Sequence, residues 1–227
     1  AGPPFDPGLF YRLEALSRED MNTLLTAPLP EGVTIDPDAL ERVYDLTIGH
    51  PHLSQLTGWL LYERVLQRPR PGPVALTRAD VDAVTDNVLA MGSEVLGAVW
   101  THGSLQEQLV LTALTALSPQ EPPKPVPFDD VGAWLMAADH PLDPRTVNAT
   151  WRRLEYEGIL KLSADGKLMI QGGLQRQWLR NHVTLSSGGL ATSWRRVALG
   201  VVAAILVLAI VLAVLNMLPA ADSNPTP

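Results

Sequence analysis

Apolar residues recur three and four positions apart along most of the chain, which is the spacing of an amphipathic helix. Several of these runs open with a helix-start signal, such as Asp36-Pro37, Thr77 or Asp143-Pro144. The pattern predicts helices over residues 6–25 (in two pieces, the second after Ser17), 36–49, 51–65, 77–89, 105–117, 128–137, 143–158 and 174–182. We therefore expect a mainly α-helical protein.

A short β-hairpin is predicted near the end of the helical region. Residues 159–163 and 167–170 are strand-like runs, and Asp165-Gly166 stands in the turn between them. Three predicted helices precede the hairpin, and helix, helix, helix, hairpin is the order of a winged helix-turn-helix. The expected organisation is a linker at 1–8, a helical bundle domain at 9–99 and a winged-helix domain at 100–183.

The C-terminal region carries a run that is apolar almost throughout. Residues 197–218 contain no charged side chain, and their length fits the roughly 20 residues that a helix needs to cross the bilayer core. Arg195 and Arg196 stand directly before this run, whereas the short polar tail at 219–227 has no lysine or arginine. Because cytoplasmic flanks hold the positive excess, we expect a single-pass helix in the inner (cytoplasmic) membrane, with everything before it cytoplasmic. Residues 184–196 are the expected juxtamembrane spacer.

Composition and motifs narrow the function classes. The 227 residues carry a net charge of -7 and no cysteine, which excludes a disulfide framework, a thiolate metal site and a cysteine nucleophile. The acidic balance argues against a protein whose main role is to coat nucleic acid. No GxxxxGK[ST], GxSxG, HExxH or GxGxxG pattern occurs, so we assign no catalytic residue and no metal ligand. The chain as given is not expected to be a complete enzyme.

The most informative stretch is ALERVYDLTIGHPHLSQLTGWLL, at residues 39–61. A helix, a Gly-His-Pro turn and a second helix resemble the helical lid of AAA+ and STAND-type P-loop ATPases, and most of all bacterial AAA-like STAND proteins. Ile48 stands where that family usually has the first glycine of a pair. PLPEGVTIDPDAL before the stretch and LTRADVDAV after it extend the resemblance to about residues 9–182. The resemblance implies the C-terminal part of such an ATPase: a helical lid, a winged helix and a transmembrane anchor.

The resemblance also implies which residues would lie at a ligand. Gly49, His50 and Pro51 match the family's Gly-x-Pro element, in which the proline lies against the nucleotide base. ATP or ADP is then the implied cofactor, with Mg²⁺ held by a P-loop core expected N-terminal to residue 1. His182 is the candidate for a histidine that this family often places near the end of the winged helix to reach the bound diphosphate. Without the resemblance, the residues favour an interpretation of Gly-His-Pro as simply a cap and start between two packed helices.

Taken together, the expected function is the lid and regulatory arm of a membrane-anchored ATPase signalling switch. Its expected partners are the ATPase core, an effector domain, the lipid bilayer and further copies of itself. One alternative is a membrane-tethered winged-helix regulator that binds DNA or a protein without nucleotide, and another is a helical adaptor. DNA binding is not favoured, because the second helix of the winged-helix motif carries three arginines (Arg145, Arg152, Arg153) against two glutamates.

Overall fold

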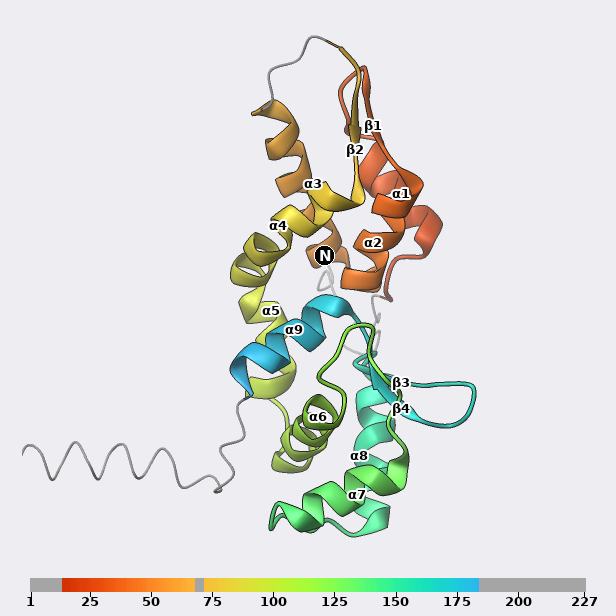
Figure 1. Cartoon of the computed structure of the whole chain (residues 1–227), viewed down its shortest axis with the longest axis vertical. Coiled ribbons are helices and arrows are strands. Elements are labelled where there is room, and N and C mark those ends of the chain that lie inside the picture. The colour runs from red at the N-terminus through yellow and green to blue at the C-terminus, as the bar shows by residue number, and fades with distance from the viewer. Residues whose placement is uncertain (1–13, 68–71, 184–227) are drawn as a thin grey trace, which may run out of the picture. The chain divides into compact units, whose positions relative to one another are not determined.

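A computed structural model describes residues 14–67 and 72–183, which belong to one compact unit (Figure 1). Within these residues the chain is mainly helical, as its sequence predicts. The elements follow in the order α1 (Arg18–Thr26), β1 (Val33–Ile35), α2 (Pro37–Thr47), α3 (Pro51–Leu66), β2 (Val74–Leu76), α4 (Arg78–Met91), α5 (Ser93–Thr101), α6 (Leu105–Leu117), α7 (Phe128–Ala137), α8 (Pro144–Tyr156), β3 (Leu160–Leu162), β4 (Leu168–Ile170) and α9 (Gly173–His182).

The helix starts lie where local chemistry places them. α2, α3 and α8 each have proline in the first turn, where its fixed φ suits a helix and its missing N–H costs nothing. α4 and α6 open with capping boxes, in which Thr77 and Ser104 exchange hydrogen bonds with Asp80 and Glu107 three residues later. These signals are local, and so the sequence identified these helices.

The first half of the described chain forms a helical bundle, here called the N-terminal bundle (α1–α4 with β1 and β2). α3 packs against α1, α2 and α4. β1 pairs with β2 in parallel, with Val33 opposite Val74 and Ile35 opposite Leu76. The sequence did not predict this strand pair, because each strand is only three residues long and its partner lies on the far side of α2 and α3.

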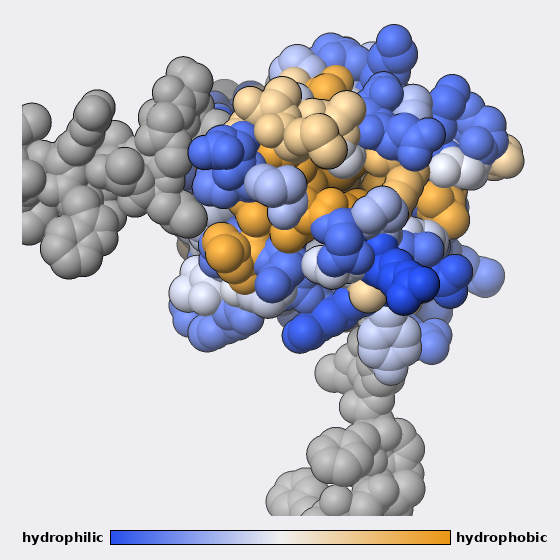
Figure 2. All heavy atoms as spheres, turned by 90° about the horizontal axis from the view of Figure 1, so that it is seen from below, coloured by the Kyte–Doolittle hydropathy of each residue, from blue (hydrophilic) through white to orange (hydrophobic). Residues whose placement is uncertain are grey.

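The second half forms the C-terminal bundle (α6, α7 and α8 with β3 and β4). α6 packs against α7 and α8, and β3 pairs antiparallel with β4, with Leu160 opposite Ile170. Val126, in the loop before α7, forms a further antiparallel bridge to Leu168. The order of three helices and a hairpin agrees with the predicted one. Figure 2 looks from below at the end that carries α7, where apolar side chains gather near the middle of a largely hydrophilic face.

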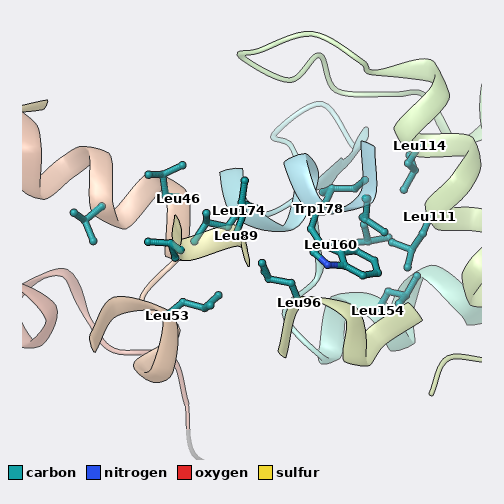
Figure 3. Packing of buried hydrophobic residues seen from close by; sticks show 14 of the residues in the cluster. Leu46, Leu53, Leu89, Leu96, Leu111, Leu114, Leu154, Leu160, Leu174 and Trp178 are labelled. Atoms are coloured by element: carbon teal, nitrogen blue, oxygen red, sulfur yellow. The ribbon is translucent and has the colours of Figure 1, made fainter. Parts of the chain in front are cut away.

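α5 and α9 join the two bundles. α9 packs against α2, α5 and α6, and its Trp178 Nε1 donates a hydrogen bond of 2.9 Å to Ser93 Oγ at the start of α5. Figure 3 shows apolar side chains running without a break from Leu46 and Leu53, through Leu96 and Trp178, toward the C-terminal bundle. The two bundles therefore share one hydrophobic core.

Some predicted features lie outside the residues that the structure describes. These are the linker at 1–8, the spacer at 184–196, the membrane helix at 197–218 and the tail at 219–227. The first piece of the helix predicted over 6–25 also lies mostly there, and its described residues, 14–17, are not helical. In the described ranges, no helix has both the length and the apolar character needed to cross a bilayer. The predicted boundary between residues 99 and 100 falls inside α5, a helix that the sequence pattern did not reveal.

Candidate functional site

The Gly-His-Pro turn connects α2 to α3 through two successive left-handed residues. Ile48 has φ 50° and Gly49 has φ 68°, after which His50 returns to extended geometry as the N-cap of α3. A β-branched residue in this region is strained by roughly 1–2 kcal/mol, which explains why a glycine would suit position 48. Gly49 is required twice over, because a Cβ there would also lie 2.2 Å from the backbone oxygen of Leu16.

His50 sits at the start of α3 with its ring held by the helix end. Its Nδ1 accepts a long hydrogen bond of 3.5 Å from the backbone N–H of Leu53. Burial and the neighbouring His52 lower the pKa of His50, while a hydrogen bond to its own backbone partly opposes them. Both effects favour the neutral ring. A neutral imidazole at this position can accept a hydrogen bond from an uncharged ligand or donate one to it.

A cleft of about 380 Å³ opens beside His50, between the N-terminal and C-terminal bundles. Its walls come from the start of α3, from α5 and α6, and from the end of α8, with Gln175 of α9 at one side. The volume lies in the range of small-molecule sites, which form preferentially where two structural units meet. The polar side chains on its walls are His50, His102, Glu107, Arg153, Glu157 and Gln175.

The charged residues of the cleft form one ion-pair group. Arg153 Nε lies 2.9 Å from Glu107 Oε1 and 3.2 Å from Glu157 Oε1. The Glu107 side chain is only 4% exposed, and its Oε2 also accepts a 2.6 Å hydrogen bond from the Ser104 backbone N–H. Two carboxylates around one guanidinium leave this group with a net charge of -1. Such a wall suits a neutral ligand that donates hydrogen bonds, and it disfavours a phosphate.

The predicted site residues come together only in part. His50 lines the cleft, whereas Gly49 and Pro51 flank it without lining it. His182 lies at the end of α9, where its ring stacks on Trp178 with centroids 4.3 Å apart and its Nδ1 is 2.8 Å from the Trp178 carbonyl oxygen. His182 is not among the cleft-lining residues that the structure describes.

The carboxylates of the cleft were missed by sequence reasoning. Glu107 is recognisable in the sequence only as the last residue of the Ser104 capping box, and Arg153 only as one of three arginines on the second helix of the winged-helix motif. Their pairing joins residues far apart in the chain, so no local pattern could reveal it. The presence of three arginines on one helix does not indicate that the Arg153 guanidinium already pairs with two carboxylates of the same chain.

A second charged group fastens the proline-rich loop before α7 to α9. Arg176 Nε and Nη2 lie 2.8 and 3.0 Å from the two carboxylate oxygens of Glu121, and Arg180 Nη2 lies 2.9 Å from Oε1. Arg180 also donates to the Pro119 carbonyl oxygen at 2.8 Å. Burial opposes ionisation of Glu121, but the arginines outweigh it and lower its pKa. This group is structural, since each of its charges already has a partner.

Within residues 14–67 and 72–183, no group of three or more histidine, aspartate or glutamate side chains is placed to hold a metal ion. Comparison with known proteins found no matching family, no matching curated protein and no matching solved structure.

Proposed function

We propose that this chain supplies the helical lid and the regulatory winged helix of a STAND-like nucleotide-driven switch, anchored to a membrane by residues 197–218. In this proposal the N-terminal bundle is the lid, and the C-terminal bundle is the winged helix. The cleft between them receives the base of ATP or ADP. The phosphates and Mg²⁺ belong to a P-loop core outside this sequence, and the chain itself supplies no catalytic residue.

The observation that carries the proposal is the position of His50. The residue comes from the Gly-His-Pro turn, the element that resembles the nucleotide-contacting turn of STAND proteins, and it lies on the wall of a ligand-sized cleft. The charge of the cleft fits the assignment to a base. Adenine is neutral and carries an exocyclic amine, which can donate to a carboxylate such as Glu157.

The contact between α9 and α2 offers a route by which a ligand at the α2–α3 turn would change the position of the winged helix, the C-terminal bundle, relative to the lid. Gly172 and Gly173 let α9 approach the end of α2 closely, because a Cβ on Gly173 would lie 2.8 Å from Leu46 Cδ2 and one on Gly172 would lie 3.3 Å from the Leu46 oxygen. The same Cβ on Gly172 would lie 3.4 Å from Ile48 Cγ1. A ligand that repositions the α2–α3 turn therefore acts on the first turn of α9 directly.

The test is ADP and ATP binding by the native polypeptide that contains this chain, measured by calorimetry. We expect tight binding, weakened about tenfold by His50→Asn, which keeps a side-chain acceptor at the helix start but removes the ring. Pro51→Ala should weaken binding less than His50→Asn does, because Pro51 does not line the cleft and acts only by fixing the start of α3. Pro37→Ala is its matched control, because Pro37 occupies the same position at the start of α2. Absence of nucleotide binding by the intact polypeptide would overturn the proposal.

A second candidate function rests on the outer face of α8. Arg145, Asn148 and Arg152 are all exposed there, and Arg152 Nε donates to Asn148 Oδ1 at 2.9 Å. Arginine and asparagine are the side chains that most often read base edges in the major groove. A winged-helix regulator would then bind duplex DNA with an affinity that falls with salt, at a log–log slope of about -0.9 for each phosphate that is also contacted. A flat salt response would remove this candidate.

A further inference from the structure

The exposed side of α3 carries aromatic and aliphatic side chains where a surface helix normally carries polar ones. Trp59 is 49% exposed and Leu66 is 54% exposed, and Tyr62 lies between them on the same helical face. Single exposed apolar residues are common, but a row of them on one helix marks an interaction surface. This row is distinct from the cleft beside His50.

A groove of about 400 Å³ runs beside this row, between α1 and α3. Leu25 of α1 and Gly58 of α3 pack closely together, since a Cβ on Gly58 would lie 2.8 Å from Leu25 Cδ2. The α1 side of the groove continues through Leu24, Pro28 and Leu29, and the α3 side through Gln55, Trp59 and Tyr62. No charged side chain is present among these described residues, so the groove suits an uncharged occupant.

The polar groups at the groove indicate the kind of occupant. The Gln55 amide, the Trp59 indole N–H and the Tyr62 hydroxyl make no hydrogen bond within the part of the chain that the structure describes. All three can donate, so they complement a ligand with free carbonyl oxygens. A bound helix supplies few of these, because all of its carbonyls except those of the last turn are used internally. A polyproline II segment has no internal hydrogen bonds and presents every carbonyl.

We propose that the groove between α1 and α3 binds an uncharged proline-rich peptide segment in the polyproline II conformation. The rings of Trp59 and Tyr62 stand one helical turn apart and take proline rings between them, as aromatic-lined grooves do in proline-recognising domains. The indole N–H of Trp59 donates to a peptide carbonyl. Leu25 and Gly58 form the uncharged base on which the peptide lies.

The experiment is calorimetric titration of the full 227-residue chain, in mild detergent, with an acetylated decaproline peptide. A glycine-serine peptide of the same length is the ligand control. We expect saturable binding of decaproline only, weakened about tenfold by Trp59→Ala. Tyr62→Phe removes a single hydroxyl with little effect on folding, and it should weaken binding by a smaller factor. Met136→Ala, at an exposed apolar residue on α7, should bind as the wild type does.

Three results would overturn the proposal. The first is no saturable binding of decaproline, and the second is equal binding of the glycine-serine peptide. The third is self-association of the chain that Trp59→Ala abolishes while decaproline does not compete, which would assign the groove to a second copy. None of these readouts depends on nucleotide, so the result is separable from that of the nucleotide experiment.

Discussion

Leu16 and Gly49 are joined backbone to backbone: the Leu16 N–H donates to the Gly49 carbonyl oxygen at 2.8 Å. The same approach leaves 2.2 Å between the Leu16 oxygen and the point where a Cβ on Gly49 would stand. The segment before α1 is therefore held against the turn that starts α3. Glycine at position 49 has a structural reason in this contact, independent of any ligand.

This contact predicts a large cost for Gly49→Ala. The left-handed backbone costs a non-glycine residue roughly 1 kcal/mol, and the clash with Leu16 adds to it, so we expect a loss of about 3 kcal/mol in the free energy of unfolding. Gly32→Ala is the matched control, because Gly32 has φ 78° with no atom within 4 Å of its added Cβ. It should lose only about 1 kcal/mol. Equal losses in urea unfolding would contradict the packing argument.

Two helical glycines should respond to alanine with opposite signs. Gly132 in α7 has open space around an added Cβ, so Gly132→Ala should stabilise the protein by about 0.5–1 kcal/mol through helix propensity alone. Gly97 in α5 lies under Trp178, and its added Cβ would stand 2.8 Å from Trp178 Cζ2. Gly97→Ala should therefore destabilise it, by loosening the contact between α5 and α9. Melting temperatures that rise for both variants would show that this contact is not tight.

The two carboxylates that pair with Arg153 should differ in how much each contributes to the free energy of unfolding. Glu107→Gln keeps the capping geometry but removes a buried charge from its partner, and we expect a loss of about 1–2 kcal/mol. Glu157 is 39% exposed and follows Arg153 at helical spacing, so Glu157→Gln should cost no more than about 0.5 kcal/mol. Chemical unfolding of both variants gives the comparison. A larger loss for Glu157→Gln would mean that Glu107 is not the main partner.

Particular helices show how much of the fold could be predicted from the sequence. α7 was predicted over the residues it occupies, and α2, α3, α4 and α8 begin at the prolines or caps that indicated them. α5 was missed because it begins after Gly92, which gives no capping side chain, and carries a glycine in its middle. The cleft could not be predicted, since it exists only where α3, α6 and α8 meet in space.

The His50 ring should make stability depend on pH near neutrality. Burial and His52 lower its pKa in the folded chain, so below pH ~6.5 the unfolded chain binds the proton more readily. The free energy of unfolding should therefore fall as the pH drops from 7.5 to 5.5. In His50→Asn this fall should be smaller. The pKa of Glu121 is also lowered, and its contribution to the free energy of unfolding is lost only below the pH range of 7.5 to 5.5. An unchanged fall in the variant would assign the pH dependence to another group.

The parallel pairing of β1 with β2 has a consequence for how the N-terminal bundle opens. Val33 precedes α2 and α3 in the sequence and Val74 follows them, so the pairing of these two residues closes a loop that contains both helices. While this pairing holds, it limits the conformational entropy that the enclosed segment can gain when α2 or α3 unfolds. Amide hydrogen exchange should accordingly report α2 and α3 as a single cooperative unit that exchanges when β1 and β2 separate.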